Sequence, residues 1–166
     1  TLGRKGAGQS MSMAAPPTVK RSGAFSPSSG LPAAHIADPI VEKAIRRSLS
    51  KSAATALDTA DLAKVTYLNL YRAKITDAGL KEVAKLQNLE TLDLESPKIT
   101  DAGLKELAKL QQLKELGLYN TKITDAGLKE VVKLPRLWRL SLFNTEITDA
   151  GLKDIAKLQN LTSLSL

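Results

Sequence analysis

The chain has 166 residues, a length that predicts one domain with room for an appendage. Its hydrophobic fraction is 43%, but aromatic residues make up only 4%, so aliphatic side chains must build the core. It contains no Cys, which excludes disulfides, thiolate catalysis and Cys-ligated metals but leaves the compartment undecided. No apolar run approaches the roughly 20 residues that a membrane span requires.

The formal net charge of +7 is unevenly distributed. The first 34 residues hold four basic and no acidic side chains, whereas residues 65–166 hold 15 basic and 13 acidic ones. The repetitive part of the chain is therefore nearly neutral. A basic chain of this kind does not imply a nucleic-acid-binding face on its folded part.

Residues 1–36 are rich in Gly, Ser, Pro and Ala, a composition that buries little and predicts a flexible basic tail. A helix is expected to follow, with Asp38 as its N-cap, Pro39 at its first position and an end near Ser50.

A second short helical turn is expected after Asp58 or Thr59. Residues 37–64 lack the repeat seen later in the chain but lead directly into it. We therefore interpret them as a helical cap over the first core layer.

Residues 65–166 are an internal repeat of four units and a fifth strand, with no C-terminal cap. The six residues Ile-Thr-Asp-Ala-Gly-Leu recur every 24 positions, and a fixed period of this size indicates a solenoid. Each unit opens with an alternating segment, which predicts a strand, and continues with apolar residues at helical spacing. The four copies begin at Ile75, Ile99, Ile123 and Ile147.

This pattern resembles the leucine-rich repeat family in a 24-residue form, close to the repeats of bacterial proteins and F-box receptor proteins. The resemblance implies an α/β solenoid with a parallel concave sheet, a helical convex side and a helical N-terminal cap. One departure is that the Asn or Cys usual after the strand is absent, so Thr or water must satisfy the backbone there. The residues at this position are Ala73, Pro97, Thr121 and Thr145.

In a parallel solenoid sheet, alternate strand positions face outward and form columns about 4.8 Å apart. Variation between the units is concentrated at these positions, and four of the six aromatic residues fall there, with Trp138 beside them. Exposed aromatic residues are enriched at binding hot spots, which indicates a binding face. The alternative is that they merely cover the sheet.

Other recurring residues favour structural roles. The convex lysines, Lys81 and Lys85 with their repeats, alternate with acids and indicate a solvated helix face rather than a phosphate-binding stripe. Each repeat helix is expected to be capped by the Thr or by the Asp at its start, such as Thr124 or Asp125, and the Asp at position 77 and its three repeats are expected to cap their own helices rather than bind metal. His35 is the only histidine, so no metal cluster or nucleophile–His pair is expected, and an F-box start at Leu31 is disfavoured.

The sequence thus predicts a non-catalytic protein-interaction module without cofactor or metal. Its partner would be a protein or peptide bound on the concave face, with no nucleic acid on the folded domain and no membrane span. The alternative is a structural subunit whose tail and open repeat end, at Leu161, Leu164 and Leu166, pack on neighbouring chains or further repeats. The predicted binding residues are Tyr67, Tyr71, Arg72, Asp93, Glu95, Glu115, Tyr119, Asn120, Trp138, Arg139, Phe143 and Asn144.

Overall fold

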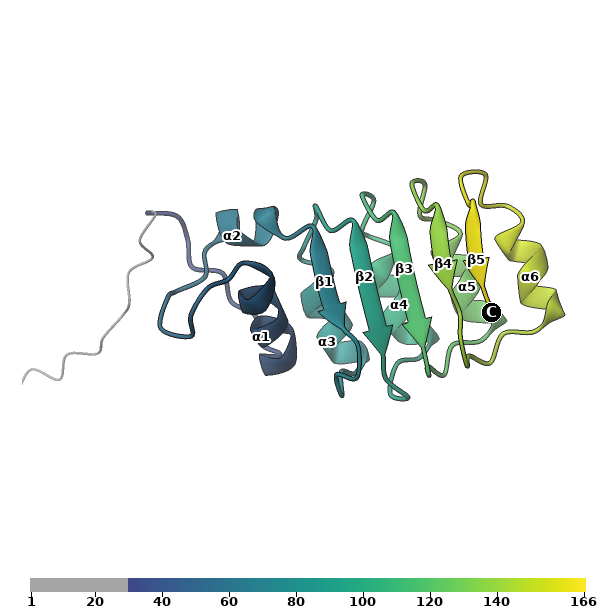
Figure 1. Cartoon of the computed structure of the whole chain (residues 1–166), viewed down its shortest axis with the longest axis horizontal. Helices are drawn as coiled ribbons and strands as arrows, with labels where there is room; N and C mark the ends of the chain where they lie inside the picture. The colour runs from purple at the N-terminus through teal and green to yellow at the C-terminus, as the bar shows by residue number, and fades with distance from the viewer. Residues whose placement is uncertain (1–29) are drawn as a thin grey trace, which may run out of the picture.

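The computed structural model describes residues 30–166 as a parallel sheet backed by a row of helices (Figure 1). The sheet has the order β1–β2–β3–β4–β5, so each strand pairs with the next one in the chain. The strands are β1 (Tyr67–Leu70), β2 (Thr91–Glu95), β3 (Glu115–Tyr119), β4 (Arg139–Ser141) and β5 (Ser163–Ser165). The helices between successive strands are α3 (Asp77–Val83), α4 (Asp101–Leu107), α5 (Asp125–Val131) and α6 (Asp149–Ile155).

Two further helices, α1 (Pro39–Ser48) and α2 (Thr59–Lys64), precede the first strand. Asp38 caps α1 by accepting the N–H groups of Ile40 and Val41, and Pro39 opens the helix as predicted. Asp58 caps α2 in a reciprocal arrangement with Asp61. The predicted α/β solenoid with a helical N-terminal cap is therefore confirmed.

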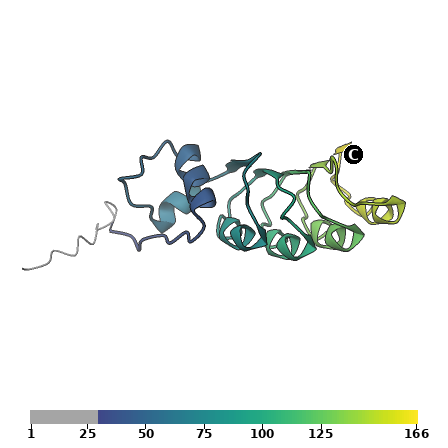
Figure 2. The ribbon, with the colours of Figure 1, turned by 90° about the horizontal axis from the view of Figure 1, so that it is seen from below.

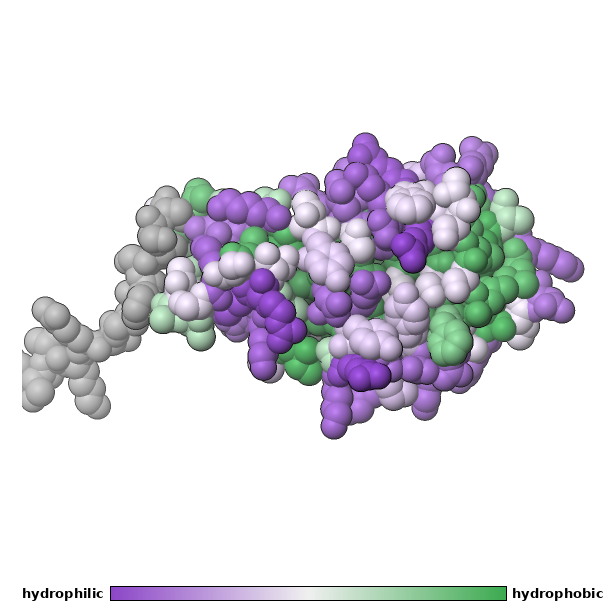
Figure 3. All heavy atoms as spheres, viewed as in Figure 1, coloured by the Kyte–Doolittle hydropathy of each residue, from purple (hydrophilic) through white to green (hydrophobic). Residues whose placement is uncertain are grey.

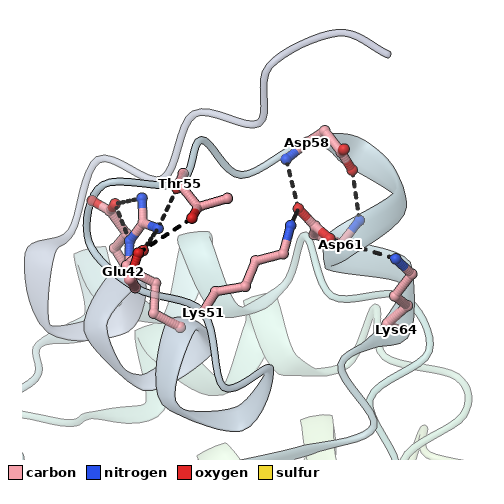
Figure 4. Close-up of polar contacts among 8 residues, drawn as sticks. Glu42, Lys51, Thr55, Asp58, Asp61 and Lys64 are labelled. Carbon is pink, nitrogen blue, oxygen red and sulfur yellow. Dashed lines mark hydrogen bonds and ion pairs between the residues drawn. The ribbon is translucent and has the colours of Figure 1, made fainter. Parts of the chain in front are cut away.

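Polar contacts hold the loop between α1 and α2 in place (Figure 4). Lys51 Nζ donates to the buried carboxylate of Asp61 at 2.5 Å. Arg46 donates both to Glu42, at 2.7 Å, and to the backbone oxygen of Thr55, at 2.6 Å. A buried carboxylate is tolerated here because Lys51, Lys64 and the backbone N–H of Asp58 contact it.

The segment before α1 also touches this cap. The N–H of Ala34 donates to the oxygen of Leu57, and Ile36 is buried in the core. Residues 1–29, which make up most of the predicted tail, lie outside the described residues.

The core lies between the sheet and the helices and consists mostly of leucines at equivalent positions. In each of β1 to β4 the residues alternate, so that leucines point inward. Figure 2 shows the helices α3, α4 and α5 in a row on one side of the sheet. Because helices are about twice as wide as the strand spacing, such a stack curves with the sheet on its concave side.

The repeated Asp does not cap its own helix, so that prediction is wrong. Thr100, Thr124 and Thr148 are the N-caps, and each hydroxyl accepts the N–H of the Ala two residues later. Three of the four repeated Asp residues instead reach the Thr of the following unit, 23 residues ahead. Asp101 accepts the N–H of Thr124 at 2.9 Å and its hydroxyl at 2.7 Å, and Asp77 and Asp125 contact Thr100 and Thr148 in the same way.

The repeated Gly explains why this contact fits. A Cβ at Gly103 would lie 2.5 Å from Asp77 Oδ1, and one at Gly127 would overlap Asp101 Oδ1. We call each set of Asp, following-unit Thr and following-unit Gly the inter-unit latch. It ties neighbouring helix starts together, which stabilises the interface between units.

The loops after the strands differ in part from the expectation that Thr satisfies their backbone. Thr145 does donate to the oxygen of Leu142, but the Thr121 hydroxyl is buried without a partner. Ser96, one position earlier in its unit, donates to the oxygen of Ile75 at 2.7 Å. Arg72, Asn120 and Asn144 adopt positive φ angles of 57°, 49° and 53° and turn the chain out of the sheet.

The convex face has the mixed charge that the sequence indicated. Lys85, Lys109, Lys133 and Lys157 form ion pairs of 2.5–2.7 Å with the acid three residues earlier. No helix within residues 30–166 is long and apolar enough to cross a membrane.

Candidate functional site: the concave sheet face

The strand register produces the predicted columns on the sheet surface that faces away from the helices. The first column is Tyr67, Thr91, Glu115, Arg139 and Ser163, and the second is Asn69, Asp93, Gly117, Ser141 and Ser165. A third row, at the carboxyl ends of the strands, holds Tyr71, Glu95, Tyr119 and Phe143. Figure 3 views this face and shows pale, weakly polar side chains between hydrophilic edges.

Three aromatic side chains of the third row border a shallow hollow of about 580 Å³. Tyr71 is 49% exposed and Phe143 58%, whereas Tyr119 is half-buried. Large apolar side chains with this exposure contact water in the free protein and release it when a partner covers them. The other lining residues are Asn69, Asp93, Arg139, Leu140, Ser141, Ser163 and Ser165.

Tyr71 and Tyr119 contact each other although they belong to units that are not neighbours. Their ring centroids lie 5.8 Å apart with an interplanar angle of 80°, an edge-to-face arrangement. The Tyr119 ring reaches back over Gly117, where an added Cβ would lie 2.5 Å from its Cε2 atom. The absence of a side chain at Gly117 thus lets this ring lie across the sheet.

Asp93 lies in the floor between these rings. Burial raises the pKa of its carboxyl above the ordinary value, against the opposing charge of Arg139 and a hydrogen bond from Tyr67. A carboxylate that is desolvated more than it is paired gains from an additional donor or cation. Asp93 therefore favours a positively charged or hydrogen-bond-donating group in the hollow.

A second hollow of about 310 Å³ adjoins the first and shares Asp93, Tyr119, Arg139 and Ser141 with it. It adds Tyr67 and Glu115, and Arg139 lies 3.7 Å from the Glu115 carboxylate. This ion pair is exposed and contributes little to stability. Both side chains are therefore available to exchange partners when a charged segment binds.

Seven of the predicted residues line the two hollows. They are Tyr67, Tyr71, Asp93, Glu115, Tyr119, Arg139 and Phe143.

The other five predicted residues lie elsewhere. Glu95 turns to the loop, where it accepts a hydrogen bond from Asn120, which in turn accepts one from Asn144. Arg72 lies 5.4 Å over the Tyr71 ring, and Trp138 precedes β4 at the opposite end of the strand.

Most of the lining residues that the prediction omitted have small or polar side chains. Asn69, Ser141, Ser163 and Ser165 line the larger hollow, and Thr91 and Gly117 line the smaller one, while Leu140 and Leu116 contribute apolar surface. The sequence shows the place of the small residues in the columns, but the prediction favoured aromatic and charged residues. Small side chains matter here because they leave the space between the large ones.

No group of three or more His, Cys, Asp or Glu side chains within residues 30–166 could hold a metal ion. The hollows contain hydroxyl, amide, guanidinium and carboxylate groups but no His. Such a set suits the recognition of a polar chain with apolar side groups.

A family model described as Leucine Rich repeat matches residues 62–84 and 85–108. No curated protein matches the chain.

Among solved structures, the chain is similar to leiomodin-1 actin-binding site 2, with a TM-score of 0.57 and 18% identity over 78% of this chain and 80% of that one. Internalin C2 of Listeria monocytogenes has a TM-score of 0.35 and 20% identity over 78% and 93% of the two chains. A second internalin of that organism has a TM-score of 0.36 and 21% identity over 65% and 43%. At 18% identity the likeness to leiomodin-1 supports the fold alone.

Proposed function

Since the chain is a leucine-rich repeat protein, we propose that it is a non-catalytic module whose concave sheet face binds an extended segment of a partner protein. Repeats of this family generally mediate protein–protein interactions. One scaffold serves many partners, so the site and not the fold must indicate what is bound. The name of the leiomodin-1 structure states actin binding for that protein, and it gives no partner for this one.

The observation that carries this proposal is the aromatic border of the larger hollow. Tyr71, Tyr119 and Phe143 surround a polar floor and remain accessible. Aromatic side chains at the centre of an interface contribute much of its binding energy, while surrounding polar groups fix orientation. An extended segment of about six residues crosses the five strands, given their spacing of about 4.8 Å.

The charges suggest how such a segment is oriented. Asp93 would contact a basic side chain, and Arg139, beside Ser163 and Ser165, would contact an acidic one. We therefore propose a partner segment with an apolar or aromatic residue between a basic and an acidic residue.

The test starts from a library of displayed peptides of about 12 residues, twice the span of the sheet. Peptides that bind the full chain are selected from this library. The affinity of a selected peptide is then measured by fluorescence polarisation for the unsubstituted chain and for the double variant Tyr119→Ala/Phe143→Ala. We expect affinity to fall at least about tenfold, since truncating one hot-spot aromatic costs about 2 kcal/mol or more. The control is Lys105→Ala/Lys129→Ala on the convex face, which is expected to change affinity less than about twofold.

Circular dichroism must show the same fold and similar melting for all variants. Unchanged affinity in the folded aromatic variant would refute the assignment of the binding face.

A further inference from the structure

A groove distinct from the two hollows lies at the edge of the repeats, between α1 and the loop that follows β1. It encloses about 580 Å³ and is lined by residues 39–47 of α1 on one side and 69–74 on the other. The α1 residues that line it are Pro39, Ile40, Lys43, Ala44 and Arg47, which form one face of the helix. Val41 and Ile45, on the other face, are buried in the core.

The groove is basic at its rim and apolar at its floor. Lys43 and Arg47 from α1 and Arg72 and Lys74 from the loop are exposed and line it, and no carboxylate lines it. Within residues 30–166, none of these four cations forms an ion pair with an acidic side chain. On the convex face, four lysines such as Lys109 are paired with acids, whereas Lys105 and Lys129 form no ion pair within residues 30–166 but lie on a face that also carries acids.

The basic rim continues along the ends of the strands. A neighbouring hollow of about 410 Å³ shares Arg72, Ala73 and Lys74 with the groove and adds Lys98. Lys122 follows Lys98 after one further repeat and is exposed. Figure 3 shows hydrophilic side chains along this lower edge of the sheet face. Glu95 is the one acidic residue that lines this hollow: one of its oxygens accepts a hydrogen bond from Asn120, and the other is buried without a partner within the described residues.

Arg72 is the least expected residue of the groove. Its φ of 57° lies in the left-handed region, where Asn120 and Asn144 stand at the equivalent position of later units. Asn adopts this conformation more readily than Arg, so Arg72 is not explained by the turn itself. Backbone strain at an exposed side chain is a reason to look for a function of that side chain.

We propose that this groove binds an acidic segment of a partner protein that carries an aliphatic anchor residue. The four cations would pair with Asp or Glu side chains, and Pro39, Ile40 and Ala44 would receive the anchor. The chain's own first 34 residues are excluded as the occupant by charge, because they carry four basic and no acidic residues. Tyr71 is the one aromatic residue that lines the groove within the described part of the chain, and the aliphatic side chains beside it favour a peptide over a nucleic acid, for which several stacking aromatics would be expected.

The groove is separate from the larger concave hollow, with which it shares only Asn69 and Tyr71. The proposal that the groove binds an acidic segment does not depend on the proposed function of that hollow. A partner that binds both surfaces would gain affinity through the short connection between them.

The test uses the full chain and a fluorescein-labelled synthetic peptide of about 12 residues in which Glu and Asp alternate with Leu. Lys43→Glu/Arg47→Glu is expected to weaken its binding at least about tenfold. The matched control, Lys105→Glu/Lys129→Glu on the convex face, changes net charge equally and is expected to weaken binding less than about threefold. Arg72→Asn removes a groove cation in a residue type that suits the turn, so its expected threefold or greater loss is not a folding effect.

Two further ligands test the class of ligand, and one further variant tests where the acidic peptide binds. A peptide with Ser in place of Leu is expected to bind several-fold more weakly, and a short DNA duplex of the same charge is expected to bind no better than this Ser peptide. Tyr119→Ala/Phe143→Ala is expected to leave binding of the acidic peptide unchanged, which separates this site from the concave hollow. Equal losses in groove and convex variants, equal binding of the Ser peptide, or tighter binding of DNA would each overturn the proposal.

Discussion

The inter-unit latch predicts that Gly127→Ala destabilises the chain, whereas helix propensity alone predicts that the same substitution stabilises it. Asp101 accepts two hydrogen bonds from Thr124, at 2.9 Å and 2.7 Å, and its Oδ1 atom occupies the space that a Cβ at Gly127 would need. In an isolated helix Gly→Ala stabilises by about 1 kcal/mol. Here Gly127→Ala must displace the Asp101 carboxylate and is expected to destabilise.

The magnitudes follow from the contacts. Hydrogen bonds to a charged group contribute about 1.5–3 kcal/mol each, and the lower end applies to a half-exposed pair, so Asp101→Ala should cost about 2–3 kcal/mol. Gly127→Ala loses the same bonds but gains helix propensity, for a net cost of about 1–2 kcal/mol.

In the Asp101→Ala background the same Gly127→Ala change should be neutral or stabilising. The nearest remaining atom is then Ile123 Cγ2 at 3.0 Å, which needs only a small shift. The double-mutant cycle should therefore give a coupling energy of about 2 kcal/mol.

The assay is urea unfolding at neutral pH, followed by circular dichroism for the whole stack and by the fluorescence of Trp138, the only tryptophan. Glu146→Ala is the control because Glu146 is exposed and its side chain forms no hydrogen bond or ion pair within residues 30–166, and it should cost less than about 0.5 kcal/mol. Additive effects of the two substitutions, or an equal cost for Glu146→Ala, would refute the latch.

Three more predictions concern stability. Burial raises the pKa of Asp61, but hydrogen bonds from Lys51 and Asp58 and the charges of Lys51 and Lys64 together outweigh it and hold the pKa below its ordinary value. Hydrogen bonds from Thr148 lower the pKa of Asp125. Since the unfolded chain binds protons more readily at both sites, their stabilisation should be complete above about pH 5 and lost as pH falls below about 4. The urea midpoint, measured across this range, should fall with pH, and Asp61→Asn should make this pH dependence less steep. A midpoint independent of pH would contradict the prediction. Arg72→Asn should raise the free energy of unfolding by up to about 0.5 kcal/mol, because Asn suits the left-handed turn but the contact of Arg72 with the Tyr71 ring is lost, and a loss of more than about 1 kcal/mol in the same urea assay would contradict strain in the turn. Leu116→Ala, at a core position 1% exposed, should cost about 2–5 kcal/mol by urea unfolding, and a cost below about 1 kcal/mol would contradict the close packing of that layer.

Much of this fold could be predicted because the chain repeats itself. A 24-residue period fixes the register of every strand at once, so Tyr67, Thr91 and Glu115 had to form one column if the units stack. Alternation of leucines then decides which side of the sheet is buried. The helix starts at Asp38 and Asp58 could be predicted because a capping side chain acts on its own neighbours in sequence.

The latch could not be predicted by the same local reasoning. An Asp at the first turn of a helix suits the helix dipole, and nothing within its own unit shows that it contacts Thr124 or its equivalents instead. The signal was available only in the pairing of each Asp with a Thr 23 residues later and a Gly shortly after it.

Side-chain directions on the sheet were also beyond the sequence. Tyr71 and Tyr119 meet across an intervening strand because Gly117 leaves room for the ring, and Glu95 turns away to Asn120. The rotamers that decide this depend on the three-dimensional neighbours. Columns of residues can therefore be predicted more easily than the hollows between them.

The most direct test of the concave-face proposal is to locate a bound peptide on the folded chain. Backbone amide chemical shifts of the isotopically labelled full chain are recorded by NMR with and without the peptide selected by display. We expect the largest changes in β1 to β4 and at Tyr71, Tyr119 and Phe143, around the larger hollow. Changes confined to the convex helices α3 to α6 would contradict the proposal.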